Sequence, residues 1–183
     1  MKRTALFVLP ALAMLMVSSS AFAQSADVDT VLLAAPANLR AAATVIKWKP
    51  DHTYDTLKKG TNKLVCYDRS GFPEQLAFAL ECTNLGNLPR AAQNQKFEAA
   101  GDKVKTQALI DAAEKDGTRI KPEFGSVWYH LQGADKEHAR THMTIATPGA
   151  TTATLGLPTS PDAGGVWIMD AGTTGAHLMT PGE

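Results

Sequence analysis

The chain has 183 residues, with 18 Lys and Arg against 18 Asp and Glu, five His and two Cys. This length is typical of one domain. Because the charges balance and the basic residues are scattered, the composition excludes a basic surface for nucleic acid and a polybasic anchor for anionic membranes. Function must therefore be sought in individual residues.

The first 23 residues have the pattern of a secretory signal peptide. Lys2 and Arg3 form a positive start, an apolar stretch follows, and the small residues Ala21 and Ala23 flank Phe22 as at a signal-peptidase site. The apolar stretch is shorter than the roughly 20 residues that span a bilayer. We therefore expect cleavage after Ala23, a periplasmic or secreted protein, and no integral membrane segment in the mature chain.

The two cysteines gain importance from this location and from the composition. The mature chain is rich in Ala and poor in large apolar residues, so its core is expected to be thin. Cys66 and Cys82 lack C-x-x-C spacing and a neighbouring His, which argues against a metal pair or a reactive thiol. In an oxidising compartment they are predicted to form a disulfide.

Strand signals follow an Ala-rich N-terminal segment. Residues 24–43 are Ala-rich, with a short helix indicated before Pro36, and such terminal segments are often poorly ordered. The folded domain is expected over residues 44–183. Its first strands are predicted from alternating β-branched residues and turn residues, over 44–49, 54–57 and 63–67.

The middle of the chain favours helices. Three are predicted, over residues 73–82, 89–100 and 103–116. The first starts at Pro73, which suits the first helical position. The last has the strongest signals, because Asp102 can cap its start and Gly117 stands just after its end.

The C-terminal third returns to strand signals. Four strands are predicted, over residues 126–131, 141–147, 166–170 and 176–180. Strands, then helices, then strands without regular alternation are typical of an α+β fold. We predict a single α+β domain with a mainly antiparallel sheet and two or three helices in the middle of the chain.

Histidine and methionine gather in this C-terminal third. Imidazole and thioether together suit copper, and imidazole also suits zinc, so His142, His177 and Met179 are candidate metal ligands. On a strand, His177 and Met179 share one face. The alternative is that the methionines belong to the core and the histidines bind backbone or water. No other cofactor is predicted.

The two histidines could share one pocket if their strands are neighbours. A parallel or crossed-end arrangement brings the rings of His142 and His177 together, with Trp128 or Trp167 as an apolar wall. Antiparallel pairing places His142 nearer Thr180 and separates the rings. We hypothesise the shared pocket.

No enzyme motif is present. Ser70 and Ser126 lack the glycine setting of a nucleophile elbow, and the glycines of residues 164–175 lack the spacing of a phosphate-binding loop. No catalytic residue is predicted.

The C-terminal segment from Gly165 to Pro181 resembles the ending of a group of uncharacterised secreted bacterial proteins. Its pattern is W-x-M-x-x-G-T-x-x-A-H-L-M, which ends at Met179. Residues 141–145 and 59–66 resemble two further segments of that group, a His–Met strand and a turn followed by a cysteine. The resemblance implies secretion and draws attention to the histidines, but it implies no reaction.

The sequence thus predicts a periplasmic or secreted protein that is a non-catalytic binding or structural component of the cell envelope. The first alternative is a protein that binds copper or zinc through the C-terminal His and Met residues. The second is an enzyme with an unrecognised site.

Overall fold

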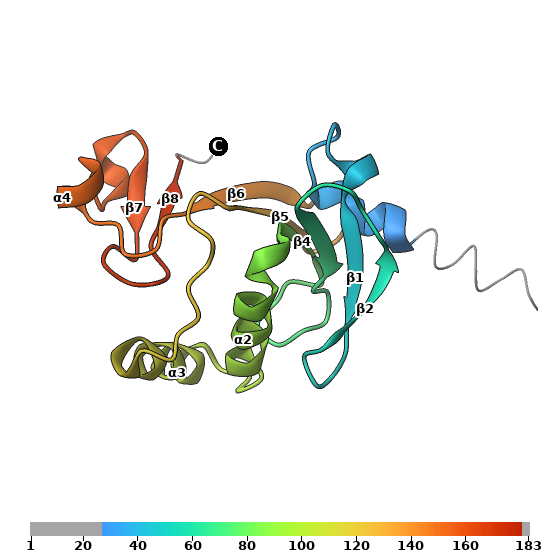
Figure 1. Cartoon of the computed structure of the whole chain (residues 1–183), viewed down its shortest axis with the longest axis horizontal. Coiled ribbons are helices and arrows are strands. Elements are labelled where there is room, and N and C mark those ends of the chain that lie inside the picture. Colours follow the sequence, from blue (N-terminus) through green and yellow to red (C-terminus); the bar gives the residue numbers. More distant parts are fainter. Residues whose placement is uncertain (1–26, 181–183) are drawn as a thin grey trace, which may run out of the picture.

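One mixed sheet organises the chain (Figure 1). The computed structural model describes residues 27–180, so the predicted signal peptide and its cleavage site lie outside the described residues. The strands are β1 (Thr44–Trp48), β2 (Tyr54–Lys58), β3 (Leu64–Asp68), β4 (Phe78–Asn84), β5 (Val127–Gly133), β6 (Arg140–Ala146), β7 (Trp167–Met169) and β8 (His177–Met179). Their order in the sheet is β2-β1-β3-β4-β5-β6-β8-β7.

The pairing is mostly antiparallel, as predicted. Within residues 27–180, β1 and β3 are the one parallel pair, and every other pair of neighbouring strands is antiparallel. The protein therefore combines α and β structure as predicted, and its sheet contains both antiparallel and parallel strand pairs.

Two longer helices lie in the middle of the chain, as predicted. They are α2 (Leu88–Glu98) and α3 (Lys103–Asp116), and Figure 1 shows both on the same side of the sheet. Helical structure also occurs outside the middle, in residues 27–31 and in the short α4 (Thr152–Leu155). In the described part of the chain, no helix has the length and apolar character needed to cross a membrane.

The predicted helix over residues 73–82 is wrong. Glu74 has a φ of 65°, which is outside the right-handed helical region, and β4 starts at Phe78. This strand lies between β3 and β5 and is buried from Ala79 to Thr83. A strand that is covered on both faces lacks the alternating apolar and polar pattern of a half-exposed strand. Its continuous apolar residues were therefore interpreted as one face of a helix.

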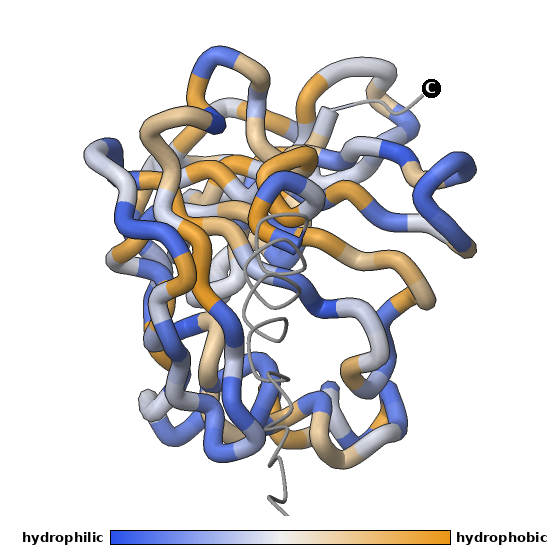
Figure 2. Tube along the Cα trace, turned by 90° about the vertical axis from the view of Figure 1, so that its right-hand side faces the viewer, coloured by the Kyte–Doolittle hydropathy of each residue, from blue (hydrophilic) through white to orange (hydrophobic). Residues whose placement is uncertain are grey.

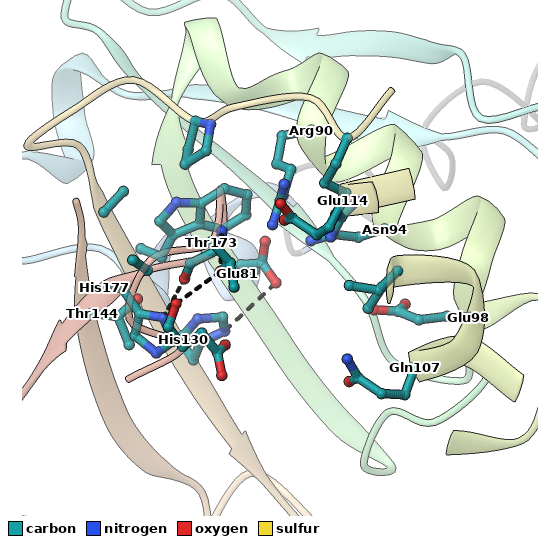
Figure 3. A pocket seen from close by; sticks show the side chains of 18 of the residues that line it. Glu81, Arg90, Asn94, Glu98, Gln107, Glu114, His130, Thr144, Thr173 and His177 are labelled. Atoms are coloured by element: carbon teal, nitrogen blue, oxygen red, sulfur yellow. Dashed lines mark hydrogen bonds and ion pairs between the residues drawn. The ribbon is translucent and has the colours of Figure 1, made fainter. Parts of the chain in front are cut away.

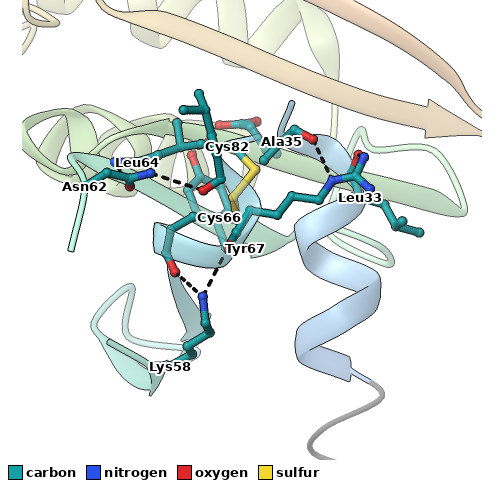
Figure 4. The surroundings of a disulfide bond; sticks show 12 residues. Leu33, Ala35, Lys58, Asn62, Leu64, Cys66, Tyr67 and Cys82 are labelled. Carbon is teal, nitrogen blue, oxygen red and sulfur yellow. Dashed lines mark hydrogen bonds between the residues drawn. A yellow bond between two sulfur atoms is a disulfide. The ribbon is translucent and has the colours of Figure 1, made fainter. Parts of the chain in front are cut away.

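The N-terminal segment covers one face of the sheet. Val31, Leu32 and Ala35 are buried in a core cluster with alternate residues of β1, β3 and β4. Arg40 fixes the segment by donating hydrogen bonds to the carbonyls of Ala35 and Leu33, at 2.8 and 3.0 Å (Figure 4). From residue 27 onward, the segment that we expected to be poorly ordered packs on the sheet.

The cysteines lie under this segment. Cys66 of β3 and Cys82 of β4 are directly opposed, with Cα atoms 4.0 Å apart, and their sulfur atoms lie at disulfide-bond distance, as predicted (Figure 4). Both residues are fully buried. The cross-link therefore joins two central strands inside the core.

The face of the sheet that the N-terminal segment does not cover is apolar in β1 and β3 and polar in β4, β5 and β6. In β1 and β3, Ile46, Val65 and Tyr67 are buried beneath Leu88 and Ala91 of α2. In β4, β5 and β6, the same face carries polar and ionisable residues instead. In the trace of Figure 2, many of the outer turns are hydrophilic.

Asp102 caps the start of α3, as predicted from the sequence. Asp102 accepts hydrogen bonds from the backbone N–H groups of Val104 and Lys105, at 2.9 and 3.1 Å. Replacing Asp102 by Ala is expected to lower the free energy of unfolding by about 1 kcal/mol, because two helical donors lose their partner. Urea denaturation measures the loss. Asp102→Asn retains an acceptor and should preserve most of the stability, so an equal loss in both variants contradicts the capping role.

Candidate functional site

A cavity of about 500 Å³ lies over the polar part of the sheet (Figure 3). Its volume falls within the range of about 300–1,000 Å³ that is usual for small-molecule sites. Figure 3 shows His130, His177 and Thr144 on one side and helix residues such as Glu98 and Glu114 on the other. The strand residues that line it include Glu81, Trp128, His130, Gln132, His142, Thr144, Ala146 and His177.

Strand register places three ionisable side chains in a row across the cavity floor. Glu81 of β4 is paired with His130 of β5, and His130 is paired with His142 of β6. Directly opposed residues of neighbouring strands point to the same face. The row is therefore a consequence of backbone pairing and does not depend on a loop conformation.

A buried ion-pair network surrounds Glu81. Its carboxylate accepts a hydrogen bond from the Tyr67 hydroxyl and lies 3.6 Å from Nη1 of Arg69 and 3.5 Å from Nδ1 of His130. Arg69 also pairs with Glu98 of α2. Burial, and then the charge of Glu81, raise the pKa of Tyr67 well above its usual value, so this hydroxyl stays protonated and donates. One guanidinium thus balances two carboxylates.

The helix side of the network holds a carboxyl with a perturbed pKa. Burial raises the pKa of Glu98 above its usual value, although Arg69 opposes this shift. The other charged residues of the cavity wall include Arg90, Asp111, Glu114 and Arg119. Burial lowers the pKa of Arg119 to about 10, which still leaves its guanidinium charged at neutral pH.

A backbone carbonyl defines the tautomer of one of the three imidazoles, that of His177. Nδ1 of His177 lies 2.8 Å from the carbonyl oxygen of Gly175, which can only accept, so Nδ1 carries the hydrogen. The lone pair of the His177 imidazole is therefore on Nε2. Nδ1 of His130 lies 3.5 Å from a carboxylate oxygen of Glu81.

His142 differs from the other two histidines. It is exposed, whereas His130 and His177 are half-buried. Partial burial lowers the pKa of His142 below its usual value, and the neighbouring His130 and His177 lower it further. At neutral pH its ring is therefore uncharged.

The C-terminal turn closes one side of the cavity. Thr174 donates from its backbone N–H to Glu114 of α3 at 3.1 Å, and its hydroxyl also bonds Glu114. Arg90 of α2 donates to the Thr174 hydroxyl at 2.9 Å and to the carbonyl of Ile120 at 2.6 Å. The turn before β8 is thus joined to both helices across the cavity.

Both predicted histidines line this cavity, but by a different arrangement from the one hypothesised. β6 and β8 are antiparallel, with Ala146 opposite His177, so the parallel arrangement is wrong. Since His142 and Ala146 are four residues apart on one strand, His142 and His177 still share a face of the sheet. The antiparallel register separates the two residues along the strands as expected, since His177 is opposite Ala146 and not His142, although both line the same cavity.

Of the other residues predicted for this site, one lines the cavity and two lie outside it. Trp128 lines the cavity, whereas Trp167 does not. Met179 is also absent from the lining, and it is paired with Trp167 between β7 and β8. The structure thus places the two histidines together without the methionine.

His130 and Glu81 were missed by the sequence analysis. A signal for His130 was available, because a hairpin centred on Lys136 pairs residue 130 with residue 142. Glu81 had no such signal, since its segment was assigned to a helix.

Two general observations complete the description. In the described part of the chain, no group of three or more His, Cys, Asp or Glu side chains is placed to hold a metal ion. Comparisons with protein-family models, curated proteins and solved structures found no match. The resemblance to secreted bacterial proteins stays a prediction, and functional inference rests on the geometry of the site.

Proposed function

We propose that this is a periplasmic or secreted, non-catalytic protein that binds a small polar molecule in the cavity over β4, β5 and β6. One observation carries the proposal: ionisable side chains face this cavity on a part of the sheet whose neighbouring part is apolar. Buried charges destabilise a fold unless they are paired, so a thin core would gain more from apolar residues here. Ligand binding would account for these polar residues, whereas the stability of the fold does not.

The chemistry of the lining defines the ligand class. Glu98, Asp111 and Glu114 offer acceptors, Arg90 and Gln107 offer donors, and the histidines offer lone pairs. Trp128 adds an aromatic surface. This mixture suits a compact hydrophilic molecule with both donors and acceptors, such as an amino acid, a sugar or a polyamine.

The location outside the cytoplasm is supported by two separate features. The sequence begins with the pattern of a signal peptide. The two cysteines lie at disulfide distance in the core, and disulfides persist in oxidising compartments. The resemblance to secreted bacterial proteins points in the same direction.

The proposal predicts that filling the cavity abolishes ligand binding. Thr144 lines the cavity, and Thr141 lies on the same strand but on the opposite face. The mature protein would be screened by thermal shift and native mass spectrometry against a pool of amino acids, sugars, polyamines and nucleosides. We expect at least one class to bind the native protein and Thr141→Trp, and to fail to bind Thr144→Trp.

Two results contradict this proposal. The first is that no compound of the pool binds at millimolar concentration. The second is that a ligand binds Thr144→Trp as tightly as it binds Thr141→Trp, which would place its site elsewhere. Circular dichroism checks that both variants are folded.

A further inference from the structure

One side of β6 is unpaired along most of its length (Figure 1). On its other side, β6 pairs with β5 continuously from Arg140 to Ile145. With β8 it pairs only at Ile145 and Ala146. Within the described residues, no strand therefore pairs with residues 140–144 on the β8 side. We call this stretch the open edge of β6.

The backbone groups that face the open edge follow from the pairing of β6 with β5. Ala146 uses its N–H and its carbonyl on the β5 side, in hydrogen bonds of 2.9 and 2.8 Å to the segment just before β5. The backbone groups of successive strand residues point to alternate sides, and the register with β5 is regular. Thr141 and Met143 therefore direct their N–H and carbonyl groups toward the open edge.

The outer edges of the sheet are protected, whereas the open edge is not. Exposed edges can pair with other chains, so proteins usually shorten, charge, kink or cover them. β2 carries charged residues and has an irregular register with β1. β7 has only three residues, and Ile168 donates its N–H to the carbonyl of Pro158 at 2.8 Å. Residues 141–144 are uncharged at neutral pH and free of proline, so this edge is suited to strand addition.

A hollow lies beside the open edge on each face of the sheet. On one face is the cavity already described, which His142 lines. On the other face is a second groove of about 850 Å³, whose lining includes Tyr129, Met143, Arg40 and residues 33–36. Side chains of an added strand alternate between the two faces, so one set would enter the cavity and the other the second groove. In strand addition, backbone hydrogen bonds supply affinity and such alternate pockets supply specificity.

The charges of the second groove indicate the kind of partner. Its ionisable lining residues are Arg40, Arg140, His130 and His142, and no carboxylate is among them. Arg140 is exposed and, within residues 27–180, forms no ion pair. An acidic side chain on an added strand would therefore be attracted. A second copy of this chain would instead bring the same arginines to the edge, which disfavours self-pairing.

We propose that the open edge of β6 binds an extended, acidic segment of a partner protein by strand addition. The segment forms backbone hydrogen bonds with Thr141 and Met143. Its acidic side chains, at alternate positions, enter the second groove near Arg40 and Arg140. The proposal does not rest on the binding of a small polar molecule in the cavity.

Amide hydrogen exchange, followed by nuclear magnetic resonance, tests the edge directly. In the free mature protein, the N–H groups of Thr141 and Met143 should exchange faster than those of His142 and Thr144, which face β5. The probe is the synthetic peptide acetyl-Thr-Glu-Thr-Glu-Thr-Glu-Thr-amide, which has acidic residues at alternate positions. We expect this peptide to bind and to abolish the fast exchange of Thr141 and Met143.

Matched peptides and variants identify what holds the segment. A peptide with Lys in place of every Glu should not bind, and Arg140→Gln should weaken binding of the acidic peptide about two- to fivefold, the range for an exposed ion pair. Met143→Pro removes an N–H donor of the open edge without altering the β5 side, so it should weaken binding about fivefold or more. Met143→Leu keeps both backbone groups and should restore native affinity.

Several results overturn the proposal. Slow exchange of Thr141 and Met143 in the free monomer would show that the edge is already covered. Absence of binding of the acidic peptide at millimolar concentration, or equal affinity for the Lys peptide, would contradict the partner. Equal affinity of Met143→Pro and Met143→Leu would contradict the backbone pairing. Dimers seen by analytical ultracentrifugation of the native protein and lost in Met143→Pro would assign the edge to a second copy. Circular dichroism checks that each variant is folded.

Discussion

Replacing Arg69 by Met is expected to lower the free energy of unfolding by about 3–5 kcal/mol, the usual result of removing one partner from a buried ion pair. Arg69 is only 3% exposed and lies between the carboxylates of Glu81 and Glu98. Met keeps the aliphatic part of the side chain, so the loss reports mainly on charge. Without the guanidinium, two carboxylates remain in the interior with no cation between them.

Urea denaturation measures this loss, and its pH dependence identifies the cause. Burial raises the pKa of Glu98 in the folded protein, and removing Arg69 removes the charge that opposes this shift. Between the unfolded and folded pKa values, the folded state then binds more protons than the unfolded state. Stability therefore falls as the pH rises through that window, and Arg69→Met should regain stability as the pH is lowered from neutrality toward the ordinary pKa of a Glu carboxyl.

A surface ion pair provides the control. Lys49 and Asp55 are 2.6 Å apart, with side chains 43% and 65% exposed. Exposed pairs contribute little because water screens them, so Lys49→Met should change stability only slightly. Equal losses in Lys49→Met and Arg69→Met, or a loss in Arg69→Met that grows on acidification, contradict the role assigned to the buried network.

Local sequence signals predicted those elements whose cause is local. The helix α3 begins after Asp102 and ends before Gly117, because a side chain caps its start and a left-handed glycine ends it. Most strands outside the centre of the sheet also follow their predicted ranges. In these elements, the residues that decide the conformation are neighbours in the sequence.

The centre of the sheet could not be predicted in this way. Glu81 fell within the helix predicted over residues 73–82, yet it is a buried strand residue that Tyr67 and Arg69 contact from the adjoining strand and turn. These contacts depend on the register between β3 and β4. A helical prediction followed because a single sequence does not reveal the partner strand.

In the candidate site, too, residue type could be identified from the sequence, whereas the strand pairing could not. His142 and His177 attracted attention as residue types, but their common cavity results from the pairing of β5, β6 and β8. His130 joins them because it is opposite His142 in the sheet. Met179 fitted the chemistry of copper but does not line the cavity, because residue type alone does not show which side chains the sheet brings together.

Removing the Cys66–Cys82 disulfide is expected to lower the free energy of unfolding by about 3 kcal/mol, as the chain-entropy model gives for a loop of this length. The two residues are 16 apart in the sequence and directly opposed in β3 and β4. In the unfolded chain the cross-link restricts the intervening loop, whereas in the folded chain the strand pairing already holds its ends together. The stabilisation thus acts mainly on the unfolded state.

The double variant Cys66→Ala/Cys82→Ala measures this effect in urea, with and without dithiothreitol. Reductant should destabilise the native protein and leave the variant unchanged, because the two Ala residues cannot be cross-linked. The variant also loses two buried sulfur atoms, so comparison with the reduced native protein separates packing from cross-linking. Alkylation of the unreduced, unfolded native protein should detect no free thiol. Two labelled cysteines in that experiment, or equal stability with and without reductant, would show that the cross-link does not support this thin core.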